Sequence, residues 1–568
     1  MKHLYYGDNL GVLRGHIASE SVDLIYLDPP FNSQADYNVI FKDQAGQESG
    51  AQILAFKDTW QWGTESEQAL MDLLPHHGQL ARFLTDFVEF LGRNSLSAYL
   101  VMMAVRFVEL HRVLKPTGSL YLHCDPTASH YLKTVLDVIF GPENFRNEII
   151  WKRSSAHSSA KRWGDIHDVI LFYSKSKTFT WNPVYTPYEP EYIQQFYRYE
   201  DVRGRYRLSD LTGAGTRAGD SGEPWRGVDP TSKGRHWAVP REAVEQLGGP
   251  EALSWASQKK LELLDKNNRI DFPKKVGGIP QFKRYLSDMP GVPIQDVVTD
   301  IGPLSPHAQE RLGYPTQKPV ALLERILSAS SNPGDVVLDP FCGCGTTISA
   351  AEKLGRQWIG IDVTHLSVSL IKARLKRDFD LVVRKDYEEI GTPKDLPAAQ
   401  YFAETDPFQF QFWIVGEIGA QPYGAVGDSK KGKKGGDTGI DGQLFFRTPD
   451  GGKIERVIVS VKAGRNLNPA MVRDLRGTVE REKAAIGVLL LAYAPTKGML
   501  QEAARAGAYT WGGRTFPKLQ ILTVEQLLSG EQPQLPRGVV NVSYEQKAAK
   551  SLTGKRTRDR GADPLFVN

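Results

Sequence analysis

A short segment near the start of the chain has the clearest potential for chemistry. Asp28-Pro29-Pro30-Phe31 follows a mostly apolar run, 22–27, that is typical of a buried parallel strand. Each proline fixes φ and lacks an N–H, so the carbonyls of Asp28 and Pro29 are not drawn into a following helix. With the Asp28 carboxylate they form a group of acceptors that suits an exocyclic NH2 on a planar ring, and Phe31 provides a stacking surface. Taken alone, the tetrapeptide fits equally well a strand followed by a proline-stiffened turn.

A second strand that ends in an acid lies far along the chain. The apolar run before Asp339 leads into Pro-Phe-Cys-Gly-Cys-Gly-Thr-Thr, where glycines at 343 and 345 let the backbone approach a ligand. The next strand ends in Asp362, roughly 20 residues further on, where an acid commonly binds ribose hydroxyls. The glycines do not complete a G-x-G-x-x-G pattern. This spacing favours a nucleoside ligand without phosphate over a dinucleotide.

Together these segments resemble the amino-methylating DNA methyltransferases, and in particular their beta class. In that class the D-P-P-[YFW] motif precedes the F-x-G-x-G cofactor motif, as it does here. The stretch 6–9 resembles the family's strand-end cofactor motif, moved to the front of the chain by permutation. The stretch 313–319 resembles the segment that leads into the cofactor motif, and 114–151 resembles the later part of the catalytic half. The resemblance covers roughly 1–175 and 306–370, and it implies a permuted Rossmann-like sheet.

The resemblance also implies roles for individual residues. The catalytic group is Asp28, Pro29, Pro30 and Phe31, of which Asp28 and the Pro29 carbonyl accept the amine hydrogens and Phe31 stacks on a flipped base. Within the family, Asp at the first motif position accompanies mostly adenine enzymes, so we expect N6-adenine methylation of duplex DNA, with N4-cytosine as the alternative.

The implied cofactor is S-adenosylmethionine. Asp362 would bind its ribose and Asp8 its adenine amino group, whereas Thr316 and Lys318 are candidates at its amino-acid end. The full set of expected cofactor residues is Asp8, Asn9, Thr316, Lys318, Asp339, Phe341, Gly343, Gly345, Thr346 and Asp362.

Length and composition fit a globular protein of several domains. The chain has 568 residues, of which 41% are hydrophobic and 24% charged, and its net charge of +4 permits nucleic-acid binding. It has no apolar run long enough to span a membrane and no secretory segment, so we expect a cytoplasmic protein. Its 3 cysteines give no disulfide framework. The expected domains are a catalytic half (1–178), a target-recognition insert (179–305), a cofactor half with connector (306–398), a restriction-endonuclease-like domain (399–540) and a basic, disordered tail (541–568).

The insert is predicted from its position and from a change of character. Regular apolar periodicity fades from about residue 180, and Gly, Pro, aromatic and basic residues become frequent. In the beta class, the target-recognition region occupies this place between the two halves. We therefore expect it to face DNA, with arginines for phosphates and guanine edges. The alternative is an irregular domain with a solvated basic surface.

The last third of the chain resembles the PD-(D/E)xK nucleases of the Mrr-like restriction type. Asp441 matches the family's acid and Lys462 its lysine, but Ser460 stands at the (D/E) position, which removes one metal ligand. Glu417 is a candidate to compensate, and so are Glu480 and Glu482. By this resemblance Asp441 would bind a divalent ion such as Mg²⁺, which activates water, while Lys462 would stabilise developing charge. The alternative is an α/β domain in which the acid and the lysine are incidental.

Three functions therefore remain open from the sequence. The chain combines modification and restriction of DNA, or it methylates DNA and carries a non-cleaving DNA-binding module, or it binds nucleic acid without catalysis. The intact Asp28 motif and cofactor loop argue against the third. Double-stranded DNA is the expected partner, with a separate restriction or defence subunit as a second one, and no membrane.

Overall fold

The described part of the protein falls into two compact units. The computed structural model describes residues 2–30, 62–154, 163–275, 277–305, 308, 310–312, 314, 316–423, 439–449 and 453–536. Phe31 and the tail expected at 541–568 lie outside these residues. One unit spans 1–182 together with 296–568, and the other spans 183–295.

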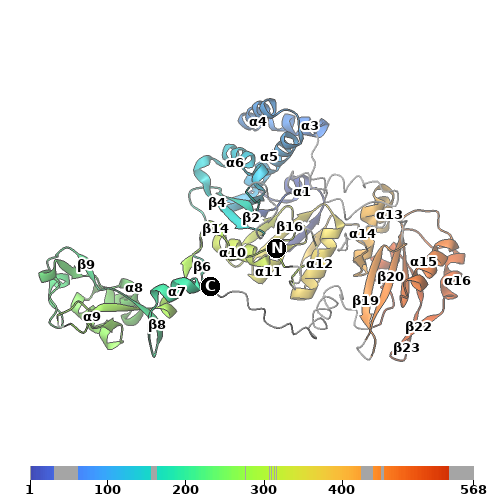
Figure 1. The fold of residues 1–568 in the computed structure, drawn as a ribbon. Coiled ribbons are helices and arrows are strands. Elements are labelled where there is room, and N and C mark those ends of the chain that lie inside the picture. The colour runs from blue at the N-terminus through green and yellow to red at the C-terminus, as the bar shows by residue number, and fades with distance from the viewer. Residues whose placement is uncertain are drawn as a thin grey trace, which may run out of the picture. The chain divides into compact units, whose positions relative to one another are not determined.

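A mixed sheet of nine strands forms the centre of the first unit (Figure 1). Its order is β14-β4-β5-β3-β2-β15-β16-β1-β17, and β5 alone among these described strands runs antiparallel to its neighbours. The strands are β1 (Lys2–Tyr6), β2 (Val22–Leu27), β3 (Leu114–Cys124), β4 (Phe145–Lys152), β5 (His167–Ser174), β14 (Val297–Val298), β15 (Val336–Asp339), β16 (Gln357–Asp362) and β17 (Glu388–Ile390).

The sheet places strands from the start of the chain beside strands more than 300 residues later in the sequence. Strand β2 lies next to β15, with Leu24 opposite Val337 and Ile25 opposite Leu338. Strand β1 lies on the other side of β16, so the first strand of the chain completes the cofactor half. This order confirms the predicted α/β class with a permuted Rossmann-like sheet.

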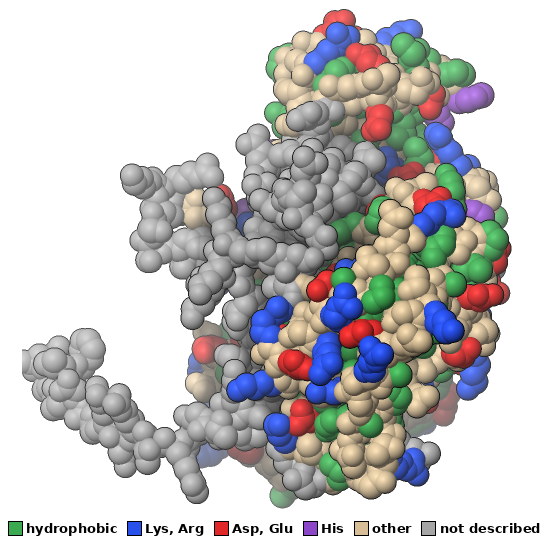
Figure 2. Space-filling view, turned by 90° about the vertical axis from the view of Figure 1, so that its right-hand side faces the viewer, with side chains coloured by type: hydrophobic (Ala, Val, Ile, Leu, Met, Phe, Trp, Pro, Cys, Tyr) green, Lys and Arg blue, Asp and Glu red, His purple; other side chains and the backbone are tan. Residues whose placement is uncertain are grey.

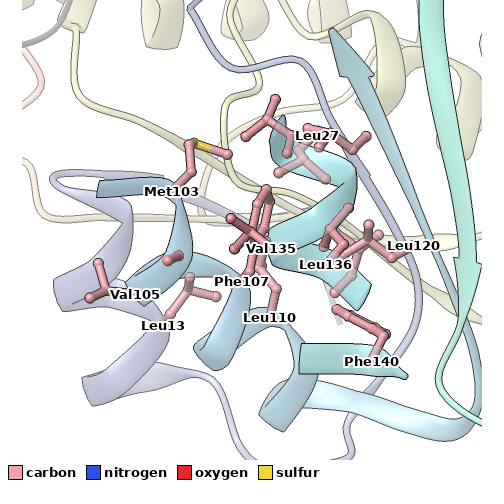
Figure 3. Packing of buried hydrophobic residues seen from close by; sticks show 14 of the residues in the cluster. Leu13, Leu27, Met103, Val105, Phe107, Leu110, Leu120, Val135, Leu136 and Phe140 are labelled. Carbon is pink, nitrogen blue, oxygen red and sulfur yellow. The ribbon is translucent and has the colours of Figure 1, made fainter. Parts of the chain in front are cut away.

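Helices cover both faces of this sheet because the central strands are apolar on both sides. One face packs against α1 (Asn9–His16), α5 (Ser95–Val113) and α6 (Pro126–Phe140). Figure 3 shows Leu13, Phe107, Val135 and Leu27 among the buried side chains of that core. The other face packs against α10 (Val320–Ser330), α11 (Thr346–Lys353) and α12 (His365–Phe379). A helical pair, α3 (Thr64–Leu73) and α4 (Gly78–Leu91), adds to the first layer.

The second unit has its own small core around Trp225, Trp237 and Phe282. Its main sheet has the order β11-β12-β8-β7. Its elements are β6 (Tyr185–Thr186), α7 (Pro190–Phe196), β7 (Tyr199–Asp201), β8 (Gly204–Asp210), β9 (Thr212–Ala214), β10 (Arg235–Trp237), α8 (Arg241–Gly248), α9 (Ser257–Lys266), β11 (Ile270–Asp271), β12 (Gln281–Tyr285) and β13 (Val292–Pro293).

The C-terminal part of the first unit contains a separate sheet of order β18-β19-β20-β21-β24. Its helices and strands are α13 (Leu396–Thr405), α14 (Pro407–Glu417), β18 (Gln421–Pro422), β19 (Gly442–Arg447), β20 (Ile454–Lys462), α15 (Pro469–Arg481), β21 (Ile486–Leu491), α16 (Lys497–Ala504), β22 (Ala508–Trp511), β23 (Arg514–Pro517), β24 (Leu519–Thr523) and α17 (Val524–Leu528). This α/β domain agrees with the fold expected there. Across the described ranges, no helix is both long and apolar enough to cross a membrane.

Candidate active site

Four carboxylates gather at one edge of the central sheet. Asp28 follows β2, Asp339 ends β15, Asp362 ends β16, and Asp8 comes two residues after β1. These four strands are parallel neighbours, so their carboxyl ends share one edge. In open α/β sheets this edge is where ligands bind. Residues from both ends of the sequence therefore meet in a single candidate site.

Asp28 is bound by a buried lysine. Lys318 Nζ lies 2.6 Å from Asp28 Oδ2, and Lys318 is only 8% exposed. The same ammonium lies 3.4 Å from the carbonyl oxygen of Thr316. A buried ammonium requires a carboxylate partner, because desolvating an unpaired charge is costly. The sequence predicted Lys318 at the amino-acid end of the cofactor, and the structure shows its ammonium bound to the Asp28 carboxylate. Its contact with a cofactor stays a prediction.

Asp339 shapes the loop that follows it. Its Oδ1 accepts a hydrogen bond of 3.1 Å from the N–H of Phe341. Burial, together with the nearby Asp28 carboxylate, raises the pKa of Asp339 to about 7. A carboxyl group that holds its proton near neutral pH can donate a hydrogen bond as well as accept one.

Asp362 fastens the same loop to the next strand. Its Oδ2 accepts a hydrogen bond of 2.9 Å from the N–H of Gly343. Its Oδ1 accepts bonds of 2.9 Å from both the N–H and the hydroxyl of Thr364, the residue that caps α12. Burial raises the pKa of Asp362 to about 6. The predicted ribose ligand thus also has a structural role in the loop.

Tight packing explains one of the two predicted loop glycines. Gly345 has φ +75°, a left-handed conformation that side chains disfavour. A Cβ atom there would lie 2.7 Å from Cγ1 of Ile371 on α12. The next residue, Thr346, is buried at the start of α11, and Arg374 Nη1 lies 3.4 Å from its hydroxyl. Its predicted contact with a cofactor stays a prediction.

Asp8 and Asn9 share an arginine partner that the sequence analysis missed. Arg106 on α5 places Nη2 2.8 Å from Asp8 Oδ1 and Nε 2.6 Å from Asn9 Oδ1. Asn9 also donates to the carbonyl oxygen of Pro340 at 2.9 Å. These contacts connect the first strand to the cofactor loop. No sequence signal pairs Arg106 with the motif, because the pairing depends on how α5 packs.

The chemistry of this edge fits S-adenosylmethionine. That molecule offers two hydroxyls, two cationic centres and no phosphate. Asp8, Asp339 and Asp362 provide oxygens for hydroxyl and amino donors. The donor set therefore agrees with the nucleoside ligand inferred from the loop spacing.

A second group of predicted residues meets in the C-terminal domain. Asp441 Oδ2 accepts hydrogen bonds from the N–H of Val461 at 2.6 Å and from the hydroxyl of Ser460 at 3.2 Å. Ser460 and Lys462 point to the same side of β20, two residues apart. The structure thus brings Asp441, Ser460 and Lys462 to one strand end.

Glu417 does not fill the gap that Ser460 leaves. Its Oε1 lies 3.0 Å from Lys372 Nζ on α12, and Glu389 lies 2.9 Å from the same ammonium. Burial alone would lower the pKa of Lys372, but these two carboxylates outweigh it and raise that pKa. Throughout the described ranges, no group of three or more His, Cys, Asp or Glu side chains could hold a metal ion.

Charges on the C-terminal domain are mixed in sign. Figure 2 shows Lys and Arg side chains interspersed with Asp and Glu. Several of the arginines are paired, as Arg465 is with Glu404 at 2.6 Å and Arg476 with Glu480 at 3.0 Å. The visible face is therefore not a single basic patch of the kind that dominates duplex binding.

Comparison with known proteins identifies two family matches. Residues 22–373 match the family model described as DNA methylase, and residues 402–519 match the model described as restriction endonuclease. The type II methyltransferase M.EcaI of Enterobacter cloacae is 34% identical over 281 residues, which are 49% of this chain and 57% of that protein.

Two further relatives extend the comparison. The Mod subunit of the type III restriction-modification enzyme StyLTI of Salmonella typhimurium is 29% identical over 367 residues, 62% of this chain and 50% of that protein. The DNA adenine methyltransferase YhdJ of Escherichia coli is 26% identical over 413 residues, 72% of this chain and 94% of that protein. The chain spans only about half the length of the Enterobacter and Salmonella relatives.

Proposed function

Because the chain belongs to the DNA methylase family, we propose that it transfers a methyl group from S-adenosylmethionine to the N6 amino group of adenine in duplex DNA. One observation carries the proposal: Asp28 follows β2, β2 lies beside the strand that ends in Asp339, and the next strand in the sheet ends in Asp362. The target amine and the methyl donor would therefore meet at a single edge of the sheet.

The choice of adenine rests on Asp28 and on one relative. Asp at this motif position resembles the adenine enzymes of the family, and the Escherichia coli relative is named a DNA adenine methyltransferase. N4 of cytosine is the alternative acceptor, since it is also an exocyclic amine. A base inside a duplex cannot reach the sheet edge, so the target base must be flipped out.

Asp28 has two tasks in this mechanism. Lys318 binds Oδ2, which leaves Oδ1 to accept a hydrogen from the amine and to turn the nitrogen lone pair away from the ring. Bound S-adenosylmethionine supplies a methyl group that is already activated on a sulfonium. The amine loses one proton as its nitrogen is methylated, and Asp28 is placed to take that proton and release it to solvent. Positioning of the amine is therefore the main contribution of the protein.

Product analysis tests this proposal. The purified full chain is incubated with labelled S-adenosylmethionine and genomic DNA, and the nucleosides are then separated by mass spectrometry. N6-methyladenine is the expected product, whereas N4-methylcytosine would overturn the choice of base. Asp28→Ala should abolish transfer while calorimetry still detects cofactor binding. Loss of cofactor binding in a folded Asp28→Ala protein would count against the role of Asp28.

We also propose that the unit 183–295 reads the DNA sequence. Its place between the two halves of the methylase supports this role. Its arginines are less available than their number suggests: Arg226 lies 2.6 Å from Asp265, and Arg235 lies 2.9 Å from Asp210. Arg217 is exposed and is a better candidate for a DNA contact. Arg217→Ala should weaken DNA binding in a salt-dependent manner, and an unchanged salt slope would remove it from the interface.

A second candidate function is cleavage of DNA by the C-terminal domain. The convergence of Asp441, Ser460 and Lys462 favours it, and the missing carboxylate predicts weak activity that requires Mg²⁺. The test uses the full chain carrying Asp28→Ala, so that methylation cannot protect the substrate. Nicking of plasmid should need Mg²⁺ and should disappear in Asp441→Ala and in Lys462→Ala. Binding without metal-dependent nicking would leave a DNA-binding module.

A partner subunit is a further part of the proposal. The Salmonella relative is named a Mod subunit, and that name supports a separate restriction or defence subunit for this chain too. Affinity purification of the tagged chain from its native cells, followed by mass spectrometry, should recover such a subunit in fixed ratio. Recovery of the chain alone would contradict it.

A further inference from the structure

A buried chain of polar side chains lies beside the Asp28–Lys318 pair. Tyr26 Oη lies 2.8 Å from His123 Nδ1, and His123 Nε2 lies 3.0 Å from Asp168 Oδ2. The chain ends at Arg153, whose Nε lies 3.1 Å from Asp168 Oδ1. The His123 and Asp168 side chains are 0% and 4% exposed, whereas Arg153 is half-exposed. Four polar residues thus run from the apolar core to the surface.

Asp168 fixes the tautomer of His123. A carboxylate can only accept, so the imidazole must donate from Nε2 to satisfy it. Nδ1 then carries the lone pair and accepts from the Tyr26 hydroxyl. Burial lowers the pKa of His123, and Lys318 lowers it further, which keeps the ring neutral. His123 therefore stays an oriented neutral dipole.

The register of the sheet places this dipole next to the target-amine acid. Leu27 of β2 pairs with Leu122 of β3, so Asp28 and His123 each follow one member of that pair. The Asp28 carboxylate also lies near Tyr26, where it adds to the effect of burial in raising the pKa of that phenol. The charged and titratable groups around His123 are Asp28 and Tyr26 from the β2 segment, Asp168 and Arg153 from the β4–β5 side, and Lys318 before α10.

A purely structural role explains this arrangement poorly. The surrounding core consists of apolar and aromatic side chains such as Trp151 and Tyr121. Well-packed hydrophobic residues would fill such a space at no cost in stability, because burying ionic groups gives little net stabilisation. A buried, fully oriented dipole beside a catalytic carboxylate instead fits the support of a functional group.

Resting on the proposed methyl transfer, we propose that His123 is a positioning residue of the target-amine site. Held by Asp168 and Tyr26, it forms the fixed polar wall against which Asp28 and Lys318 are set, and it carries no proton during the reaction. Tyr26 and Asp168 act through His123, and Arg153 anchors the outer end of the chain.

The variant His123→Gln distinguishes a positioning role of His123 from a role in proton transfer. In His123→Gln, the amide nitrogen can donate to Asp168 and the amide oxygen can accept from Tyr26, but no ionisable nitrogen remains. We expect its kcat to stay within about tenfold of wild type with an unshifted pH profile, whereas His123→Leu should lose on the order of 100-fold in kcat. The Kd of S-adenosylmethionine should not change in either variant, because His123 supports the amine side of the site.

Each other outcome overturns the inference. If His123→Gln is as inactive as His123→Leu while both remain folded, His123 carries a proton. If a folded His123→Leu protein keeps wild-type kcat, the chain only fills space. Should His123→Leu fail to fold, Tyr26→Phe removes a single hydroxyl, and it should lower kcat about tenfold at unchanged cofactor Kd. A wild-type protein that binds the cofactor but methylates no DNA would remove the proposed function and this inference together.

Discussion

The pair between Lys318 and Asp28 makes a quantitative prediction. Lys318→Met keeps the length of the side chain and removes its charge. The two partners lie 2.6 Å apart with side chains 10% and 17% exposed, so Asp28 would remain largely buried without a partner. Breaking a buried pair costs about 3–5 kcal/mol, and the residual exposure favours the lower end, about 3 kcal/mol. We take the same loss for the transition state, in which Asp28 would hold the amine; at 1.36 kcal/mol per factor of ten, kcat should fall roughly 100-fold.

A matched control distinguishes the loss of the Lys318–Asp28 pair from the general effect of removing a lysine. Lys353 lies 2.6 Å from Glu324, the same separation, but these side chains are 60% and 25% exposed. Exposed pairs contribute about 0–1 kcal/mol, so Lys353→Met should leave kcat unchanged. The assay is transfer of a tritiated methyl group to DNA at saturating cofactor, with calorimetry for cofactor Kd. A Lys318→Met protein with normal kcat and a raised cofactor Kd would refute the reasoning and assign Lys318 to the cofactor.

Three further outcomes follow from the cofactor edge. Asp362→Ala should raise the Kd of S-adenosylmethionine by a factor that corresponds to roughly 1.5–3 kcal/mol, as calorimetry would show, and an unchanged Kd would make this acid purely structural. Asp339 has a folded pKa raised to about 7, so it binds a proton in the folded state between about pH 4 and 7 and its contribution to stability falls as pH rises through that window. Asp339→Asn should therefore gain thermal stability relative to wild type more at pH 8 than at pH 5, and parallel Tm curves would contradict this. Gly345→Ala should lower the free energy of unfolding, measured with denaturant, by about 1–3 kcal/mol because of the positive φ and the contact with Ile371. Gly15→Ala is the control: Gly15 lies in α1 with open space around it, so this variant should raise the free energy of unfolding by about 0.5–1 kcal/mol. Equal effects of the two substitutions would contradict the packing argument.

Several features of the protein follow from the sequence because they depend on short-range patterns. The apolar run at 22–27 predicted a strand, and β2 has these bounds. Asp28 and Asp362 were expected at strand ends, and both are found there. Apolar runs and the residues that end them act over a few neighbours, so they can be recognised without the fold.

Other features were decided only by tertiary packing. The sequence did not predict that Lys318 pairs with Asp28, nor that Glu417, considered for a metal site, pairs with Lys372. Arg106 reaches Asp8 only because α5 lies beside α1. A long charged side chain can pair with any opposite charge that the fold brings within reach. When the side chain is buried it must be paired, because an unpaired buried charge is costly.

The candidate active site shows which features the sequence determines and which the tertiary structure determines. The sequence determined that Asp28 and Asp339 each end an apolar strand, since that depends on neighbouring residues. Only the sheet decided that these strands lie side by side, through the pairing of Leu24 with Val337 across a long stretch of chain. On the other side of β2, the pairing of Leu27 with Leu122 of β3 set His123 next to Asp28, a proximity that no spacing in the sequence contains. Residue types and local periodicity fix which groups can do chemistry, whereas contacts between distant segments fix which of them meet, because only the folded core brings those segments together.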